Sequence, residues 1–170
     1  MSNPTTRNPA PPAPSADGAP RVPAAVPMLG VVLALAGLAI AAYLTVEHYT
    51  SPALLACPEN AVINCRKVTS SPQSAIAGVP VVWLGVAYFA AMTATCVPAA
   101  WRSRHRALRT GRMLLATAGI ATALYLVYAE LFEINAICLW CTAVHVISAL
   151  LFALTAFGTA LTSRPPTRAG

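Results

Sequence analysis

Four long apolar stretches are the feature that most limits what this chain can fold into. They run from Met28 to Val46, from Val79 to Ala100, from Met113 to Phe132 and from Cys138 to about Leu161. A helix needs roughly 20 apolar residues to cross a lipid bilayer, and each stretch is close to that length. Hydrophobic residues make up 57% of the chain and charged residues only 9%, which is unusually apolar for a soluble domain. We therefore expect an all-α fold, an integral membrane four-helix bundle.

The positions of the charges predict how these helices are oriented. Arginines precede the first stretch, fill segment 101–112 between the second and third, and follow the fourth, whereas Glu47, Glu59, Glu130 and Glu133 lie in or beside the other two connections. Because basic residues favour the cytoplasmic side, we expect both termini and the middle connection in the cytoplasm. Arg also outnumbers Lys ten to one, which hints at a GC-rich bacterial genome. The expected location is a bacterial plasma membrane, crossed several times.

The formal net charge of +6 raises the question of nucleic-acid binding. The basic segment 101–112, WRSRHRALRTGR, has two interpretations. It is either a patch for nucleic acid or anionic lipid, or a loop that sets the orientation, with Trp101 at the membrane interface. We favour the loop, and we expect membrane lipid but no nucleic acid as a partner.

The chain divides into three parts. Residues 1–27 hold eight of the 15 prolines and should form a disordered cytoplasmic tail. Residues 28–161 should form the membrane domain, and residues 162–170 a short cytoplasmic tail. The first apolar stretch is either a signal peptide or a retained anchor, and the inward start that the later helices require favours the anchor.

The first outer loop, from Glu47 to about Gly78, should carry a short interfacial helix across the mouth of the bundle. In the segment SSPQSAIAGVP, Ser71 would be the N-cap, Pro72 the first helical residue and Gly78 the terminator. Pro80 would then begin the second membrane helix.

Four of the five cysteines fall on the expected outer side: Cys57, Cys65, Cys138 and Cys141. Disulfides form readily in that compartment. Cys138 and Cys141 form a CxxC pair on one face at the start of a helix, where the helix N-terminus favours a thiolate. Because this helix continues into lipid, the pair would lie between aqueous thiols and a lipid-soluble electron acceptor. A quinone is the natural candidate.

These four cysteines have three interpretations. They could form two inert structural disulfides, bind zinc, or pass electrons from one pair to the other. Seven residues separate Cys57 from Cys65, which does not fit the close spacing of zinc ligands, so we expect no metal. We favour the redox relay, in which a long outer loop lets Cys57 and Cys65 reach the helical pair, and the structural interpretation stays open.

Two residues near the CxxC pair are further candidates. His145 lies on the same helical stripe, deeper in the membrane, where an ionisable side chain is expensive and usually functional. It would donate a hydrogen bond to a quinone oxygen, or else be a core histidine bonded to a backbone carbonyl. Trp140 would either shape the quinone pocket or anchor the helix at the interface.

Together these residues resemble the vitamin K epoxide reductase family. One matching block is CRKVTSSPQSAIAGVPVVWLGVAY, residues 65–88, and the other is CLWCTAVH at the head of the fourth stretch. With Cys57 placed eight positions before Cys65, the resemblance covers residues 28–161.

The resemblance implies a four-helix bundle around a quinone and electron transfer from thiols to that quinone. It implies that Cys141 contacts the quinone, that Cys138 forms a mixed disulfide with Cys65, and that Cys57 meets the outside partner. Ser71 resembles the loop serine of the family. Ser74 stands where some members have a quinone-bonding Asn, and His145 stands where animal members have Tyr.

The resemblance also suggests partners. Many bacterial members carry a fused thioredoxin-like domain, but only nine residues follow Leu161 here. We therefore expect a separate extracytoplasmic thioredoxin-fold protein as the thiol donor, and a quinone acceptor, with menaquinone favoured over ubiquinone. The competing hypothesis is a non-enzymatic, disulfide-stapled membrane scaffold with four spans.

Overall fold

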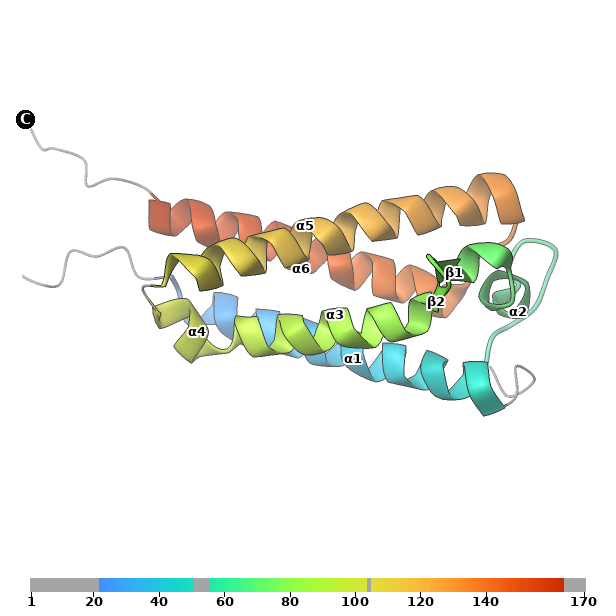
Figure 1. Cartoon of the computed structure of the whole chain (residues 1–170), viewed down its shortest axis with the longest axis horizontal. Helices are drawn as coiled ribbons and strands as arrows, with labels where there is room; N and C mark the ends of the chain where they lie inside the picture. The colour runs from blue at the N-terminus through green and yellow to red at the C-terminus, as the bar shows by residue number, and fades with distance from the viewer. Residues whose placement is uncertain (1–21, 51–55, 104, 164–170) are drawn as a thin grey trace, which may run out of the picture.

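Four long helices run side by side in the computed structural model of the chain (Figure 1). The structure describes residues 22–50, 56–103 and 105–163. The long helices are α1 (Ala25–Thr50), α3 (Val81–Cys96), α5 (Arg106–Tyr128) and α6 (Leu139–Ser163). The first and last described residues lie at one end of the bundle, near α4 (Pro98–Arg102), and α2 (Cys65–Thr69) lies at the other (Figure 1). The predicted all-α membrane bundle is confirmed.

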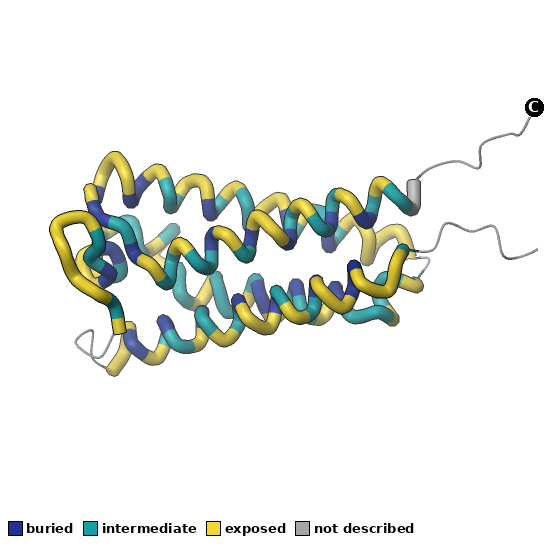
Figure 2. Tube along the Cα trace, turned by 180° about the vertical axis from the view of Figure 1, so that it is seen from behind, coloured by how far each residue is buried: buried dark blue, intermediate teal, exposed yellow. Residues whose placement is uncertain are grey.

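The helices are long and apolar enough for a membrane. Three segments meet both criteria, Ala25–Thr50, Arg106–Ile134 and Leu139–Leu161, and α3 is a shorter apolar helix. Exposed residues alternate with buried ones along each helix (Figure 2). Large apolar side chains such as Leu114 (65% exposed) face outward. An apolar outer surface is suited to lipid, so this is a membrane protein.

Small residues let α1 approach its neighbours closely. Gly30, Ala34, Gly37 and Ala41 are all buried and recur on one side of α1 at helical spacing. The fully buried ring of Phe89 from α3 packs directly on Gly37, where any side chain would collide with it. Helix pairs in membranes commonly associate through such small residues, because packing there replaces the hydrophobic effect.

The second apolar stretch is not one uninterrupted helix as predicted. Its first residues, Val79–Pro80, form the short strand β2, and α3 ends at Cys96. Val97 is extended (φ −56°, ψ 145°), because a residue before proline avoids the helical region, and α4 follows from Pro98. Pro98 therefore breaks the predicted span Val79–Ala100 near its end.

The third helix begins earlier than predicted. The stretch from Met113 was expected to start it, but α5 begins at Arg106. Arg112 is buried, its guanidinium lies 3.5 Å from the centre of the Trp101 ring, and its Nη1 donates a hydrogen bond to the Thr95 carbonyl. These contacts compensate the buried charge, so the helix can include the arginine.

The last turn of this helix widens into a π-helix, η4 (Ala129–Ile134). It ends at Asn135, whose φ of +52° is the left-handed conformation that asparagine tolerates. The Ala136 N–H then donates to the Glu130 carbonyl at 3.1 Å, which closes the turn toward α6. Such π-turns often occur at functional sites.

The outer loop contains two short helical segments. One is α2, with Asn64 as its N-cap, which was not predicted. At the predicted position Ser71 is the N-cap and Pro72 the first residue of a helical turn, as expected, but the turn is much shorter than predicted. The segment after Ser71 forms one 3₁₀ turn, η3 (Pro72–Ser74), and then an antiparallel hairpin of β1 (Ala75–Ile76) and β2. Its two turn residues, Ala77 and Gly78, both have positive φ, as tight hairpin turns require. Gly78 therefore serves a hairpin and does not terminate a helix.

Most residues of the two predicted tails lie outside the part of the chain that the structure describes. Residues 1–21 and 164–170 are not described. Helix α1 begins three residues before the expected domain start at Met28, and α6 extends two residues past Leu161. The division into residues 1–27, 28–161 and 162–170 stays a prediction.

Candidate functional site

Cysteines from two distant parts of the chain meet at one end of the bundle. Cys57 and Cys65 form a disulfide with a Cα–Cα distance of 6.3 Å, whereas Cys138 and Cys141 are free thiols. Cys65 and Cys138 belong to one buried cluster, and Cys57 and Cys141 pack against it. We call these four residues the cysteine cluster. Among the described residues, no three His, Cys, Asp or Glu side chains are placed to hold a metal ion.

Backbone hydrogen bonds hold the Cys65 side of the loop against the start of α6. The Ile137 N–H donates to the Val62 carbonyl at 2.9 Å, and the Asn64 N–H donates to the Ile137 carbonyl at 3.1 Å. Asn64 immediately precedes Cys65, and Ile137 immediately precedes Cys138. This pairing therefore places the two buried cysteines next to each other.

Trp140 holds the Cys57 side of the loop. Its indole N–H donates to the Ala56 carbonyl at 3.0 Å, one residue before Cys57, and its ring centre lies 5.1 Å from that of Tyr43. Among the described residues, those that line the neighbouring cavity do not include Trp140. Its contacts are therefore those of an anchor for the loop.

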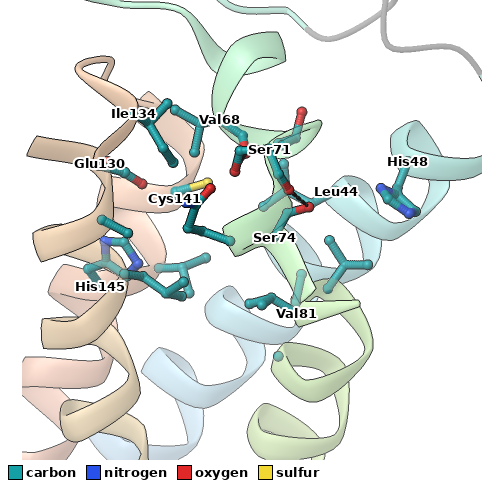
Figure 3. A pocket seen from close by; sticks show the side chains of 18 residues that line it. Leu44, His48, Val68, Ser71, Ser74, Val81, Glu130, Ile134, Cys141 and His145 are labelled. Atoms are coloured by element: carbon teal, nitrogen blue, oxygen red, sulfur yellow. Dashed lines mark hydrogen bonds between the residues drawn. The ribbon is translucent and has the colours of Figure 1, made fainter. Parts of the chain in front are cut away.

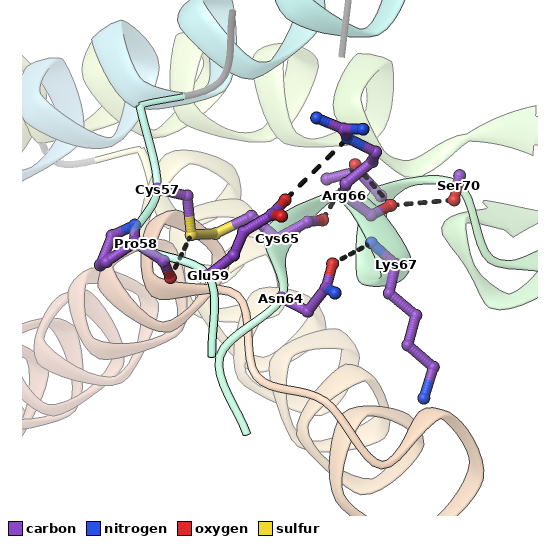
Figure 4. Close-up of polar contacts among 9 residues, drawn as sticks. Cys57, Pro58, Glu59, Asn64, Cys65, Arg66, Lys67 and Ser70 are labelled. Atoms are coloured by element: carbon purple, nitrogen blue, oxygen red, sulfur yellow. Dashed lines mark hydrogen bonds and ion pairs between the residues drawn. A yellow bond between two sulfur atoms is a disulfide. The ribbon is translucent and has the colours of Figure 1, made fainter. Parts of the chain in front are cut away.

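The two residues of the loop disulfide differ in exposure. Cys57 is half-buried, whereas Cys65 is fully buried. Figure 4 shows the disulfide beside α2, where the Asn64 side chain accepts a hydrogen bond from the Lys67 N–H at 2.9 Å. This cap fixes the first turn of α2 and therefore the position of Cys65. Of the two residues, Cys57 is therefore the one that an outside thiol would meet.

The two thiols of the CxxC pair differ in environment. Cys138 precedes α6, lies outside the spanning segments and is fully buried, whereas Cys141 is half-buried and faces a cavity. The hydrogen bond from the Cys141 thiol lowers the pKa of Cys138, and this effect exceeds the opposing effect of burial. The Cys141 backbone N–H also donates to the Cys138 sulfur at 3.3 Å. Cys138 is therefore the thiol that more readily becomes a thiolate.

An apolar cavity of about 100 Å³ lies directly beside Cys141. Residues of α1, α3, α5, η4 and α6 form its walls, and α2 and η3 contribute residues from the loop (Figure 3). An apolar cavity of about 150 Å³ is enough for a benzene ring. This cavity is smaller, so a quinone ring would need the lining side chains to move outward before it could bind.

Three of the predicted quinone-binding residues line this cavity: Ser71, Ser74 and His145. His145 is 8% exposed, and its Nδ1 atom is buried without a hydrogen-bond partner among the described residues. The hydroxyl of Ser71 donates to the Val68 carbonyl, and that of Ser74 donates to the Ser71 carbonyl. Both serines would have to rotate before they could donate to a ligand, whereas His145 has a nitrogen available.

Sequence reasoning overlooked Glu130 as a site residue. Its side chain is 5% exposed and lines the cavity together with Cys141 and His145. The charge pattern alone marks it only as an acidic residue beside the third connection. The signal was present in the sequence, since a carboxyl inside an apolar stretch is costly and usually functional.

A second overlooked contact ties the loop to the third connection. The side-chain amide of Gln73 donates to the Glu133 carboxylate at 2.8 Å. The partners are 60 residues apart in the sequence, and no local pattern pairs them. This bond closes the loop segment that contains Ser71 and Ser74 over the cavity.

Comparison with known proteins agrees with this geometry. No curated protein matches the chain in sequence. Residues 28–156 match the Vitamin K epoxide reductase family, and this range contains the cysteine cluster, the cavity-lining residues and nearly all of the four long helices. The chain therefore belongs to the vitamin K epoxide reductase family, a family of membrane oxidoreductases.

Proposed function

We propose that the protein is a membrane thiol:quinone oxidoreductase that reoxidises an extracytoplasmic thioredoxin-fold protein and reduces a quinone. The observation that carries this proposal is the packing of the loop disulfide and the free CxxC thiols in one cluster at the edge of an apolar cavity. A structural staple needs neither free thiols nor a neighbouring cavity. A redox relay needs both.

Electrons enter at the loop disulfide. A thiolate of the partner attacks the accessible Cys57 sulfur, and the Cys65 thiolate leaves. The second partner thiol then displaces Cys57, so that the partner becomes a disulfide and the loop holds two thiols. The half-buried position of Cys57 supports this order of attack.

The loop then passes its electrons to the CxxC pair. Cys65 attacks Cys138 in a Cys138–Cys141 disulfide, and the Cys141 thiolate leaves. Cys57 resolves the mixed disulfide, which restores the loop disulfide and releases Cys138. The result has an oxidised loop and two free CxxC thiols, and the structure has this combination of bonds.

The residues around the cavity fit a quinone ring. The cavity lies beside Cys141, its walls are largely apolar, and the unpartnered His145 Nδ1 can interact with a ring oxygen. Cys141 is the cysteine of the cluster that lines the cavity, so we assign it the contact with the substrate. We propose menaquinone first and ubiquinone second.

We propose that the cysteine cluster faces the outside of a bacterial plasma membrane. The first and last described residues lie together at the opposite end, beside the connection that carries Arg102 and Arg106 (Figure 1). This arrangement supports cytoplasmic termini by the positive-inside rule. The partner would then be a separate extracytoplasmic protein.

Anaerobic turnover tests the proposed function. Purified protein is mixed with a reduced thioredoxin-fold donor and either a menaquinone or a ubiquinone analogue, and quinol formation is followed. We expect turnover by the wild type and by Cys96→Ser, whose thiol is buried on α3 outside the cysteine cluster, but not by Cys141→Ser. Equal inactivity of all three proteins, with both cysteine pairs oxidised in cells, would favour the scaffold hypothesis.

A further inference from the structure

Glu130 is a buried acid whose place in the site needs an explanation. It lies in η4, is 5% exposed, and no cation pairs with it within the described residues. A buried charge without a counter-ion is costly, so such a carboxyl is retained where it exchanges a proton or accepts strong hydrogen bonds.

The surroundings of Glu130 are the reacting sulfurs. The backbone N–H of Cys138 donates a hydrogen bond to its carboxyl group, and the carboxyl interacts electrostatically with both Cys138 and Cys141. Figure 3 shows Glu130 beside Cys141 on the wall of the cavity, with His145 below them. The carboxyl therefore lies beside the CxxC pair, on the wall of the space assigned to the quinone.

Backbone geometry holds Glu130 in this position. In η4 both Ala129 and Glu130 are buried, whereas residues 131–133 are exposed. The hydrogen bond from the Ala136 N–H to the Glu130 carbonyl then brings the chain back toward Cys138. The backbone of the turn therefore fixes the position from which the Glu130 side chain extends.

The proposed reaction moves two protons as well as two electrons. Two S–H bonds break, one S–S bond forms between Cys138 and Cys141, and the quinone becomes a quinol with two new O–H bonds. The cavity wall is largely apolar, so the protons need a carrier on the protein. Cys141 faces the cavity and can deliver its own proton, but Cys138 is fully buried.

We propose that Glu130 carries the proton of the Cys138 thiol to the quinone, an inference that rests on the proposed function. Glu130 accepts the proton as Cys138 becomes a thiolate, and it gives the proton to one quinone oxygen as the disulfide forms. The Cys141 proton goes to the other oxygen. Glu130 thus ends the cycle in the protonation state in which it began.

The test is single-turnover oxidation of the reduced CxxC pair by a quinone analogue under anaerobic conditions. Glu130→Gln keeps the size and hydrogen bonding of the side chain but cannot transfer a proton, and we expect the rate to fall about 100-fold. Glu130→Asp should restore a large part of the rate. The matched control is Glu47→Gln, since Glu47 is a buried acid on α1 that does not line the cavity. It should react like the wild type.

Several results would overturn the inference. A Glu130→Gln rate within about twofold of the wild type would do so, as would equal loss in Glu130→Gln and Glu130→Asp. If Glu130→Gln does not fold, the wild type is measured instead. Its CxxC thiols should be oxidised by the quinone analogue more slowly in D₂O than in H₂O, and an unchanged rate counts against proton transfer. A wild type that oxidises its thiols with neither quinone would instead refute the proposed function itself.

Discussion

Cys138 and Cys141 are only three positions apart, yet the structure places them in different surroundings. Cys138 is fully buried in one cluster with Cys65, whereas Cys141 faces the cavity. The difference follows from their places at the helix start, since Cys138 precedes the first turn of α6 and Cys141 lies within it. One thiol is positioned for exchange with the loop and the other for the substrate.

Removal of Cys141 should trap the exchange step. In Cys141→Ser, the Cys138 thiolate can attack the Cys65 sulfur and release Cys57. Because Cys141 is absent, no thiol of the CxxC pair can resolve the new bond, and only the return of Cys57 to Cys65 reverses it. We expect a Cys65–Cys138 disulfide in non-reduced peptides analysed by mass spectrometry. Cys96→Ser serves as the control and should not show it. A folded Cys141→Ser protein that keeps only the Cys57–Cys65 bond would contradict the relay.

The pKa of Cys138 should lie below the ordinary thiol value of 9.0, because the Cys141 thiol donates a hydrogen bond to it. We expect the thiolate absorbance of a reduced variant lacking Cys57, Cys65 and Cys96 to appear at a lower pH than that of free cysteine. Adding Cys141→Ala to this variant should raise the pH at which the thiolate absorbance appears. An unchanged pH would contradict the proposed hydrogen bond from the Cys141 thiol to Cys138.

The same shift predicts a dependence of stability on pH. The lowered pKa of Cys138 contributes to the free energy of unfolding most fully above pH 9.0, and the contribution is lost as the pH falls through the folded-state pKa. Denaturant unfolding of the reduced variant lacking Cys57, Cys65 and Cys96 should show this trend. Addition of Cys141→Ala should weaken it.

At the scale of elements, the loop segment from α2 to the β1–β2 hairpin acts as a cover for the cavity. This segment is joined to the rest of the site by the Gln73–Glu133 hydrogen bond, and the part of the loop before α2 is joined by the pairing at Ile137 and by the Trp140 indole. These contacts reach η4, the connection between η4 and α6, or the first turn of α6. They hold the loop against the CxxC pair.

Trp140→Phe should uncouple the loop without removing the ring. The phenyl group can still pack on Tyr43, but the hydrogen bond to Ala56 is lost, at a cost of about 1 kcal/mol in the free energy of unfolding. We expect slower formation of the Cys65–Cys138 disulfide in the Cys141→Ser background.

Trp83→Phe provides the matched control for this change. It removes the hydrogen bond between the Trp83 indole and the Tyr49 hydroxyl, which joins α3 to α1 away from the cysteine cluster. The loss of stability should be similar, but disulfide formation should keep its wild-type rate. Equal slowing in both variants would show that Trp140 acts only through general stability.

At the scale of the whole molecule, the even number of long helices places the two described ends on the same side of the bundle (Figure 1). The cysteine cluster and its cover occupy the other side. This separation lets thiol chemistry proceed at one membrane surface while the arginine-rich connection stays at the other.

Cysteine labelling tests this orientation. In a background without native cysteines, Ala61→Cys lies in the exposed loop and Ala107→Cys lies at the exposed start of α5. A membrane-impermeant maleimide applied to intact cells should label Ala61→Cys only, and permeabilised cells should show both. Labelling of Ala107→Cys alone in intact cells would reverse the proposed topology.

Several features of this protein were accessible from local sequence patterns. Apolar length predicts the helices, and the spacing of the cysteines predicts a redox pair at a helix start. Local patterns were misleading at Ala77–Gly78. These two residues form a hairpin turn with positive φ, but such turns more often contain Asn or Asp before Gly, so Gly78 was predicted to end a helix. Pro98 is a break signal that the apolar length of its stretch obscured.

The sequence by itself determined a membrane bundle with a CxxC pair at one end, because hydrophobicity and helical spacing act over neighbouring residues. Tertiary structure alone decided that Trp140 holds the loop instead of lining the cavity and that Glu130 lies beside the thiols. These contacts join segments up to 84 residues apart. They depend on how the loop and the turn after η4 pack together, which no local pattern specifies.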